Sequence, residues 1–351
     1  MTYFVVAQMG LFSPFGAKLE FDYMLRTINL LFIIYLYLYL YLYKINIGRK
    51  KNYLNDLKNS NLIQSAGNST GSLETKRQIS NFKKEEDRNS FNSWLAGIVD
   101  GKGSFNLIKR KITNKWELND IKIKVHSRDV KILIRIRDYY GFGTLINIQN
   151  KPYSIYIVSD PKEMSVLVND INGLIRIKVD YFQKSCTYLG IKYIESDYTL
   201  SPNDPYFSGL IDTKGFIVFN YSCNRIECNL ELNYNKYTKK LNLDNVIPNY
   251  KPYILLRKNK KKTIVFKYQT IEGMTNIYHY FMVNRLYSDQ KNYRVNKIME
   301  FISIRDLRSS PLDSPKFEIY SNFLWNWVRF KNPLWYKTKF LDYIKPVWIS
   351  T

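Results

Sequence analysis

The 351-residue sequence contains only three cysteines and two histidines. Three cysteines are too few for a disulfide-stapled scaffold and indicate a reducing compartment. Two histidines argue against a His-based metal site and against a Ser/His/Asp triad. Acidic residues are also scarce, because 30 Asp and Glu stand against 53 Lys and Arg, a net charge of +23. A compact protein with this charge repels itself unless an anion offsets it, so we expect nucleic acid as the first partner and an anionic membrane surface as the second.

Long apolar runs are absent except at residues 28–43, INLLFIIYLYLYLYLY. A membrane-spanning helix needs about 20 apolar residues, so this run is slightly short, and its Leu/Tyr alternation also fits a strand. We therefore describe residues 1–51 as an N-terminal extension with a candidate transmembrane segment at 28–43. Residues 52–90 are rich in Ser, Asn, Gly and mixed charge, which predicts a polar linker.

From residue 91 the sequence changes to densely alternating helix and strand patterns. The apolar spacing predicts a helix, two strands, a helix, two strands and a helix over 91–200. The same order recurs over 201–351, where a helical stretch is expected at 238–247 and further helices follow at the C-terminus. This duplication predicts an α+β protein of two pseudo-symmetric αββαββα halves.

The segments that open the two repeats match residue by residue. The first, 95–103, reads LAGIVDGKG, and the second, 207–215, reads FSGLIDTKG, at an offset of 112 residues. Small residues in both segments allow two helix backbones to approach closely, and glycines close both segments. The residues expected at this helix interface are Ala96, Gly97, Gly103, Ser208, Gly209 and Gly215.

These paired segments resemble the motif of the LAGLIDADG homing endonuclease and RNA maturase family in its two-motif, single-chain form. The resemblance covers roughly residues 93–343 and includes GFGTL at 141–145. It implies that the motif helices join two halves, each of which presents a curved antiparallel sheet to the major groove of DNA. It also implies that an acid at the eighth motif position of each helix holds a divalent metal such as Mg²⁺. Members are often encoded in mitochondrial group I introns, and they cut intron-insertion-site DNA, assist RNA splicing, or do both.

The eighth motif position departs from this pattern, because it is Lys102 in the first copy and Lys214 in the second. An ammonium group does not coordinate Mg²⁺, and metal-assisted phosphodiester cleavage needs carboxylates there. Asp100 and Asp212 are the fallback acids, although they lie two residues earlier and point largely away on a helix. Three interpretations stay open: binding retained without cleavage, decay without activity, and residual cleavage. For the first of them, no catalytic or metal-binding residue is assigned, and Lys102 and Lys214 contact phosphates directly.

Basic residues also alternate with apolar ones along the predicted strands, which places cations on one sheet face. Lys258, Lys260, Lys261 and Lys262 are interpreted as the second-repeat equivalent of the basic turn at 109–111. The strand at 226–233 differs, because its polar face carries Glu and Asn, which predicts unlike half-sites. The candidate nucleic-acid-binding residues are Lys102, Lys109, Arg110, Lys111, Lys122, Lys124, Lys214, Lys258, Lys260, Lys261 and Lys262.

The function that these patterns favour is a degenerate homing endonuclease that binds nucleic acid and acts as an RNA maturase for its group I intron. The first alternative is an active homing endonuclease that makes metal-dependent double-strand breaks at the intron-insertion site. A further alternative is a membrane-attached basic protein. We expect a monomer in the mitochondrial matrix, with intron RNA or insertion-site DNA as partner and with membrane contact, if any, through residues 28–43.

Overall fold

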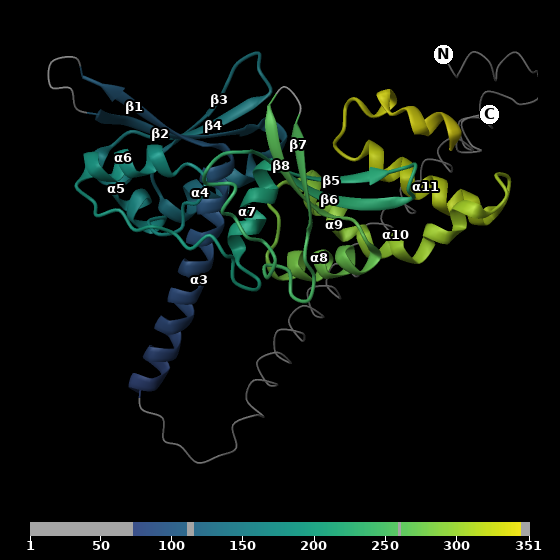
Figure 1. Ribbon diagram of the computed structural model, residues 1–351, viewed down its shortest axis with the longest axis horizontal. Coiled ribbons are helices and arrows are strands. Elements are labelled where there is room, and N and C mark those ends of the chain that lie inside the picture. Colours follow the sequence, from purple (N-terminus) through teal and green to yellow (C-terminus); the bar gives the residue numbers. More distant parts are fainter. Residues whose placement is uncertain (1–72, 111–115, 259–260, 345–351) are drawn as a thin grey trace, which may run out of the picture. The chain divides into compact units, whose positions relative to one another are not determined.

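The computed structural model describes residues 73–110, 116–258 and 261–344 (Figure 1). Its contacts divide the chain into two compact units, Met1–Arg77 and Gln78–Thr351, and, apart from residues 73–77, everything described below belongs to the second unit. The first half of that unit contains two pairs of strands and the helices that pack on one side of them. In chain order these are α3 (Leu73–Lys102), β1 (Gly103–Lys109), β2 (Trp116–His126), α4 (Lys131–Tyr140), β3 (Thr144–Asn147), β4 (Tyr153–Val158), α5 (Pro161–Asp170) and α6 (Val179–Leu189).

The second half repeats the four strands and ends in a longer set of helices (Figure 1). The elements are α7 (Pro205–Lys214), β5 (Gly215–Asn220), β6 (Arg225–Asn233), β7 (Tyr253–Lys258), β8 (Lys262–Tyr268), α8 (Ile271–Val283), α9 (Asp289–Asn296), α10 (Ile298–Ile304) and α11 (Pro315–Arg329). Both sheets are antiparallel and have the same strand order, β1-β2-β4-β3 in the first and β5-β6-β8-β7 in the second. The predicted α+β class and its duplication are therefore confirmed.

Three details differ from the sequence expectations. The segment 238–247, expected to be helical, forms turns, so the second half lacks a counterpart of α4. Its Asn and Asp residues favour turn hydrogen bonds over a helix, and the Asn242 side chain accepts one from the backbone N–H of Asp244 at 2.9 Å. Helices α6 and α9 were not expected, and residues 73–90, interpreted as part of a linker, form the start of α3. The apolar run 28–43 lies outside the described residues, and no helix within those residues is long and apolar enough to cross a membrane.

The two motif helices, the end of α3 and α7, pack on each other through glycine. A Cβ placed on Gly97 would lie 2.2 Å from the carbonyl oxygen of Tyr206, and one on Gly209 would lie 2.1 Å from that of Trp94. These two contacts are related by the 112-residue offset, so they are the same contact seen from each half. Ala96 and Ser208 are buried beside them. Gly103 and Gly215 fill a second matched pair of sites, each tight against the residue four positions earlier, Val99 or Ile211.

We predict that Gly97→Ala and Gly209→Ala each lower the free energy of unfolding by at least about 1–3 kcal/mol, the usual cost of overpacking a filled interior. The added methyl group meets backbone atoms of the opposite helix, which cannot rotate away. Chemical denaturation monitored by circular dichroism measures the change. Gln183→Ala, at an exposed position of α6, is the control and should leave stability within about 0.5 kcal/mol of the unaltered chain. An equally small effect of Gly97→Ala would contradict the close helix approach.

Candidate nucleic-acid interface

The carboxylate at the sixth motif position of the first helix, Asp100, anchors the chain before α6. It accepts hydrogen bonds from the backbone N–H groups of Arg176, Ile177 and Lys178 at 2.7, 3.1 and 2.8 Å. The hydroxyl of Tyr206, from the other half, donates a fourth at 2.7 Å. Burial raises the pKa of Asp100 although these hydrogen bonds lower it. Both of its oxygens are occupied by protein donors.

Asp212 plays the matching part in the second half. It accepts from the backbone N–H groups of Tyr287 and Ser288, at 3.0 and 2.9 Å, and so anchors the start of α9. The indole N–H of Trp94 donates to it from the first half at 3.3 Å. Burial raises the pKa of Asp212 to about 7, against the hydrogen bonds from Ser288 and Trp94 and the charge of Lys291. Trp94 and Tyr206 are themselves 112 residues apart, so each half donates one hydrogen bond to the aspartate of the other.

Two half-buried lysines, Lys178 and Lys291, bind the carbonyl groups at the ends of the motif helices. The Lys178 ammonium donates to the carbonyl oxygens of Val99 and Gly103. The Lys291 ammonium donates to those of Ile211 and Asp212, both at 2.7 Å. A cation at a helix C-terminus satisfies orphan carbonyls and interacts favourably with the helix dipole. Burial lowers the pKa of each lysine to about 8.

Lys102 and Lys214 extend from the same two helix ends. Lys102 is exposed and Lys214 is half-buried. Burial and the charge of Lys102 lower the pKa of Lys214, and both lysines also depress the pKa of Lys178. The three ammonium groups are therefore close enough to repel one another, and a polyanion such as a phosphate backbone would relieve this repulsion.

This donor set does not fit a divalent metal ion. Mg²⁺ requires oxygen ligands, whereas the eighth motif positions supply ammonium groups. The fallback proposal that Asp100 and Asp212 replace the missing acids is not supported, because backbone amides already occupy their carboxylates. Among the described residues, no group of three or more His, Cys, Asp or Glu side chains could hold a metal ion.

The outer face of the first sheet, the side away from its core, carries the predicted lysines of β2. Lys124 is exposed, and its ammonium lies 4.2 Å from the centre of the Tyr153 ring. Lys122 is instead paired with the buried Asp120, 3.0 Å away, and the amide of Asn106 donates to the same carboxylate oxygen. Lys124 is thus available to a phosphate, whereas the charge of Lys122 is largely offset.

The outer face of the second sheet is a network of paired charges. Glu227 accepts hydrogen bonds from Arg225 and Asn220 at 2.8 and 3.0 Å, and the Lys267 ammonium lies 3.4 Å away. Burial opposes ionisation of Glu227, but these partners hold its pKa at about 2. Glu231 accepts from Arg257 in the same way. The acids expected on this strand are present, yet each neutralises a basic neighbour.

The remaining predicted cations lie at hairpin tips. Lys109 and Arg110 are exposed at the β1–β2 tip, and Arg110 donates to Glu117. Lys258, Lys261 and Lys262 are exposed at the β7–β8 tip. Lys111 and Lys260 lie outside the described residues.

The interpretation of these two basic turns as equivalent is wrong. The strand orders show that the β1–β2 hairpin corresponds to β5–β6, and that β7–β8 corresponds to β3–β4. The basic turns are therefore separate features of the two halves. Both turns are rich in lysine, and only the strand order shows that they are not equivalent.

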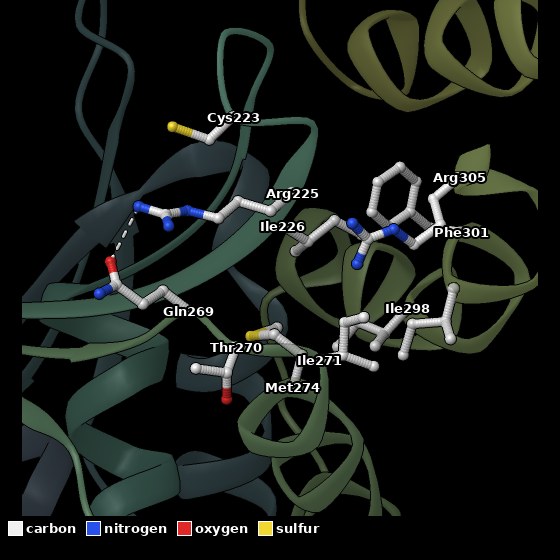
Figure 2. A pocket seen from close by; sticks show the side chains of 11 residues that line it. Cys223, Arg225, Ile226, Gln269, Thr270, Ile271, Met274, Ile298, Phe301 and Arg305 are labelled. Carbon is white, nitrogen blue, oxygen red and sulfur yellow. Dashed lines mark hydrogen bonds between the residues drawn. The ribbon is translucent and has the colours of Figure 1, made fainter. Parts of the chain in front are cut away.

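A cavity of about 280 Å³ opens between the β5–β6 turn, the start of α8 and α10 (Figure 2). Apolar side chains such as Met274 and Phe301 line it together with Arg225, which donates to Gln269 at 3.0 Å. Cys223 lies exposed at this cavity, whereas Cys228 is buried in the core, so the two thiols do not form a shared site.

Sequence reasoning missed the half-buried lysines and the crossed hydrogen bonds. Lys178 and Lys291 are 113 residues apart, and Trp94 and Tyr206 are 112 apart. Extending the repeat alignment at the same offset would have paired Trp94 with Tyr206, whereas pairing Lys178 with Lys291 also requires a one-residue insertion. It would not have shown their roles, because the carbonyl and carboxylate partners are brought together only by the fold.

Comparison with known proteins agrees with this geometry. Residues 95–194 match the family model described as LAGLIDADG endonuclease. The second copy of the motif, in α7, then repeats the same contacts at a fixed offset. The first half of the chain therefore matches the LAGLIDADG endonuclease family.

Curated proteins that this chain is similar to include intron-encoded proteins of two kinds. An intron-encoded RNA maturase of Saccharomyces cerevisiae, bI4, is 33% identical over 150 residues, which cover 42% of this chain and 22% of the relative. An intron-encoded DNA endonuclease of Dictyostelium discoideum, ai2a, is 26% identical over 280 residues, which cover 76% of this chain and 84% of the relative. The chain spans 22% and 39% of the lengths of the first two curated relatives it matches.

Solved structures of LAGLIDADG homing endonucleases with DNA are also similar. I-LtrWI bound to target DNA has a TM-score of 0.49 at 12% identity, covering 70% of this chain and 98% of that chain. I-GzeII in complex with its DNA target has a TM-score of 0.48 at 15% identity, covering 68% and 98%.

We predict that the affinity for nucleic acid falls as the pH rises from about 7 to about 9. Lys178 has a pKa of about 8 and begins to lose its charge in this range, and burial and the charge of Lys102 lower the pKa of Lys214 as well. A phosphate stabilises the protonated forms, so binding takes up protons and weakens as they become scarce. Fluorescence anisotropy of a labelled oligonucleotide across this pH range measures the effect.

Lys214→Arg keeps the charge and should flatten the pH dependence, whereas Lys262→Met, at the β7–β8 tip, should leave it unchanged. An affinity that is constant between pH about 7 and about 9 would show that the lysines at the helix ends do not contact the nucleic acid.

Proposed function

We propose that this chain binds nucleic acid without metal-dependent cleavage and acts as an RNA maturase on the group I intron that encodes it. The observation that carries the proposal is the pair Lys102 and Lys214 at the helix ends, beside aspartates whose oxygens are already bonded to the protein. Cations there favour a phosphate backbone, and the same cations disfavour a bound metal ion. The intron-encoded relatives support a mitochondrial setting and a partner of intron RNA or insertion-site DNA.

The second candidate is an active homing endonuclease. One observation favours it, because the Dictyostelium relative that aligns over most of its length is described as a DNA endonuclease. The chemistry of the helix ends opposes it. A basic protein attached to a membrane through residues 28–43 has no support from the described residues.

The unaltered chain should bind matched intron RNA and intronless duplex DNA equally well in Mg²⁺ and in EDTA, and it should leave the DNA intact. The reason is that phosphate contacts from lysine need no metal ion. Binding is measured by electrophoretic mobility shift and cleavage by gel electrophoresis of end-labelled DNA, while a splicing assay on the intron RNA tests the maturase role. Efficient Mg²⁺-dependent cleavage by the unaltered chain would make the homing endonuclease the correct assignment.

The variant Lys102→Asp with Lys214→Asp tests why cleavage is lost. It should bind more weakly, because two cations beside phosphate become anions, and it should gain Mg²⁺-dependent strand breakage. Each single substitution should give at most a nick, since each position serves one half. Lys102→Gln with Lys214→Gln is the matched control, which weakens binding and gains no cleavage.

Salt dependence separates the two lysines of β2. Each phosphate contact to duplex DNA contributes about −0.9 to the slope of log K against log salt. Lys124→Ala should reduce the slope by about one such unit, and Lys122→Ala should reduce it by less because Asp120 already offsets its charge. Lys162→Ala, exposed on α5, is the control. If Lys124→Ala leaves the slope unchanged, the outer face of the first sheet does not meet the phosphates.

A further inference from the structure

One row of residues crosses the outer face of the second sheet and is flanked by exposed aromatic rings. The strand register aligns Phe216 of β5, Asn229 of β6, Lys267 of β8 and Tyr253 of β7. Phe216 is 55% exposed and Tyr253 is 57% exposed. Neighbouring strands are about 4.8 Å apart, so the two rings stand on strands about 14 Å apart.

The orientation of this row follows from its neighbours. Gly215 and Ile217, on either side of Phe216, are buried, so Phe216 faces outward. Lys267, which pairs with Tyr253, contacts Glu227 on the outer face, while the adjacent Phe266 is in the core. The two rings therefore share the face that carries the charge network.

The first sheet does not have this feature. The row that corresponds by strand order and register is Ser104, Lys122, Ile157 and Thr144, which contains no aromatic residue. The outward ring of Tyr153 lies outside this row, is 37% exposed and has the Lys124 ammonium 4.2 Å from its centre. The two outer faces therefore differ in chemistry. The first sheet carries the exposed cation Lys124, whereas the second carries the exposed rings of Phe216 and Tyr253 among paired charges.

Exposed rings on a sheet suit one kind of nucleic-acid partner. In a duplex the faces of the bases are covered by the stack, and only base edges are accessible in the grooves. In an unpaired strand the faces are free and stack on aromatic side chains, as on the four-stranded sheets of single-strand RNA-binding domains. Phe216 follows Lys214 by two residues, within about 7 Å along the backbone, so a strand stacked there has its phosphates near the lysines at the helix ends.

We propose that the second sheet binds an unpaired segment of nucleic acid, with bases stacked on Phe216 and Tyr253. This inference rests on the proposed function and narrows it, because it assigns single-stranded character to the target of one half. The ion pairs Glu227–Lys267 and Glu231–Arg257 lie on the same face of the sheet as the rings. The lysines at the helix ends neutralise the phosphate backbone of the bound strand.

The test compares the full chain with Phe216→Leu, Tyr253→Leu and the double variant. The probes are a fluorescein-labelled oligouridylate and an RNA duplex of the same length. Each lost stack should weaken oligouridylate binding at least about 5-fold and leave duplex binding nearly unchanged. Phe216→Trp, which keeps a larger ring, should bind the oligouridylate at least as tightly as the unaltered chain.

Two controls and the contrary outcomes make the test decisive. Tyr181→Leu alters a ring that is 59% exposed on α6, a helix of the first half, and Ser104→Ala alters the matching position of the first sheet; neither should change binding. An equal loss of affinity for both probes, or no loss for either, would overturn the stacking role. The proposed function would still stand in that case if the chain binds nucleic acid in a salt-dependent way. Failure of the unaltered chain to bind either probe or the intron RNA would overturn both.

Discussion

The close approach of α3 and α7 is the constraint on which the rest of the structure depends. Gly97 and Gly209 let each helix backbone lie against the carbonyl groups of the other, so that no other residue fits at either position. Because the helices touch, Trp94 and Tyr206 reach across and hydrogen-bond the aspartate of the opposite half. The same packing brings both helix C-termini, and therefore both eighth-position lysines, to one place.

At the end of each motif helix, the sixth motif position makes structural contacts, and the eighth is the position that we propose to bind the ligand. The sixth-position aspartates hold the backbone ahead of α6 and α9, and half-buried lysines bind the last carbonyl groups. These contacts are all internal to the chain. Lys102 and Lys214 at the eighth position make no such contact among the described residues, and we propose that they suit a phosphate where an acid would suit a metal ion.

Much of this architecture could be predicted from the repeat, because the motif spacing and strand periodicity are local signals. The helix pairing at Gly97 and Gly209 followed from small residues in register. The helix expected at 238–247 did not form, and the two basic hairpins proved not to be equivalent, because strand order is a property of the whole sheet. Likewise, the alternation of apolar and basic residues along the strand does not reveal that Lys122 pairs with Asp120.

The central claim is that Lys102 and Lys214 contact the phosphate backbone, and lysine footprinting tests it most directly. The chain is treated with an amine-reactive ester, free and bound to intron RNA without Mg²⁺, and modification is quantified by mass spectrometry. In the free protein Lys102 is exposed and Lys214 is half-buried, and we predict that bound RNA lowers the reactivity of both while Lys162 on α5 stays reactive. Unchanged reactivity of Lys102 and Lys214 in a saturated complex would contradict it.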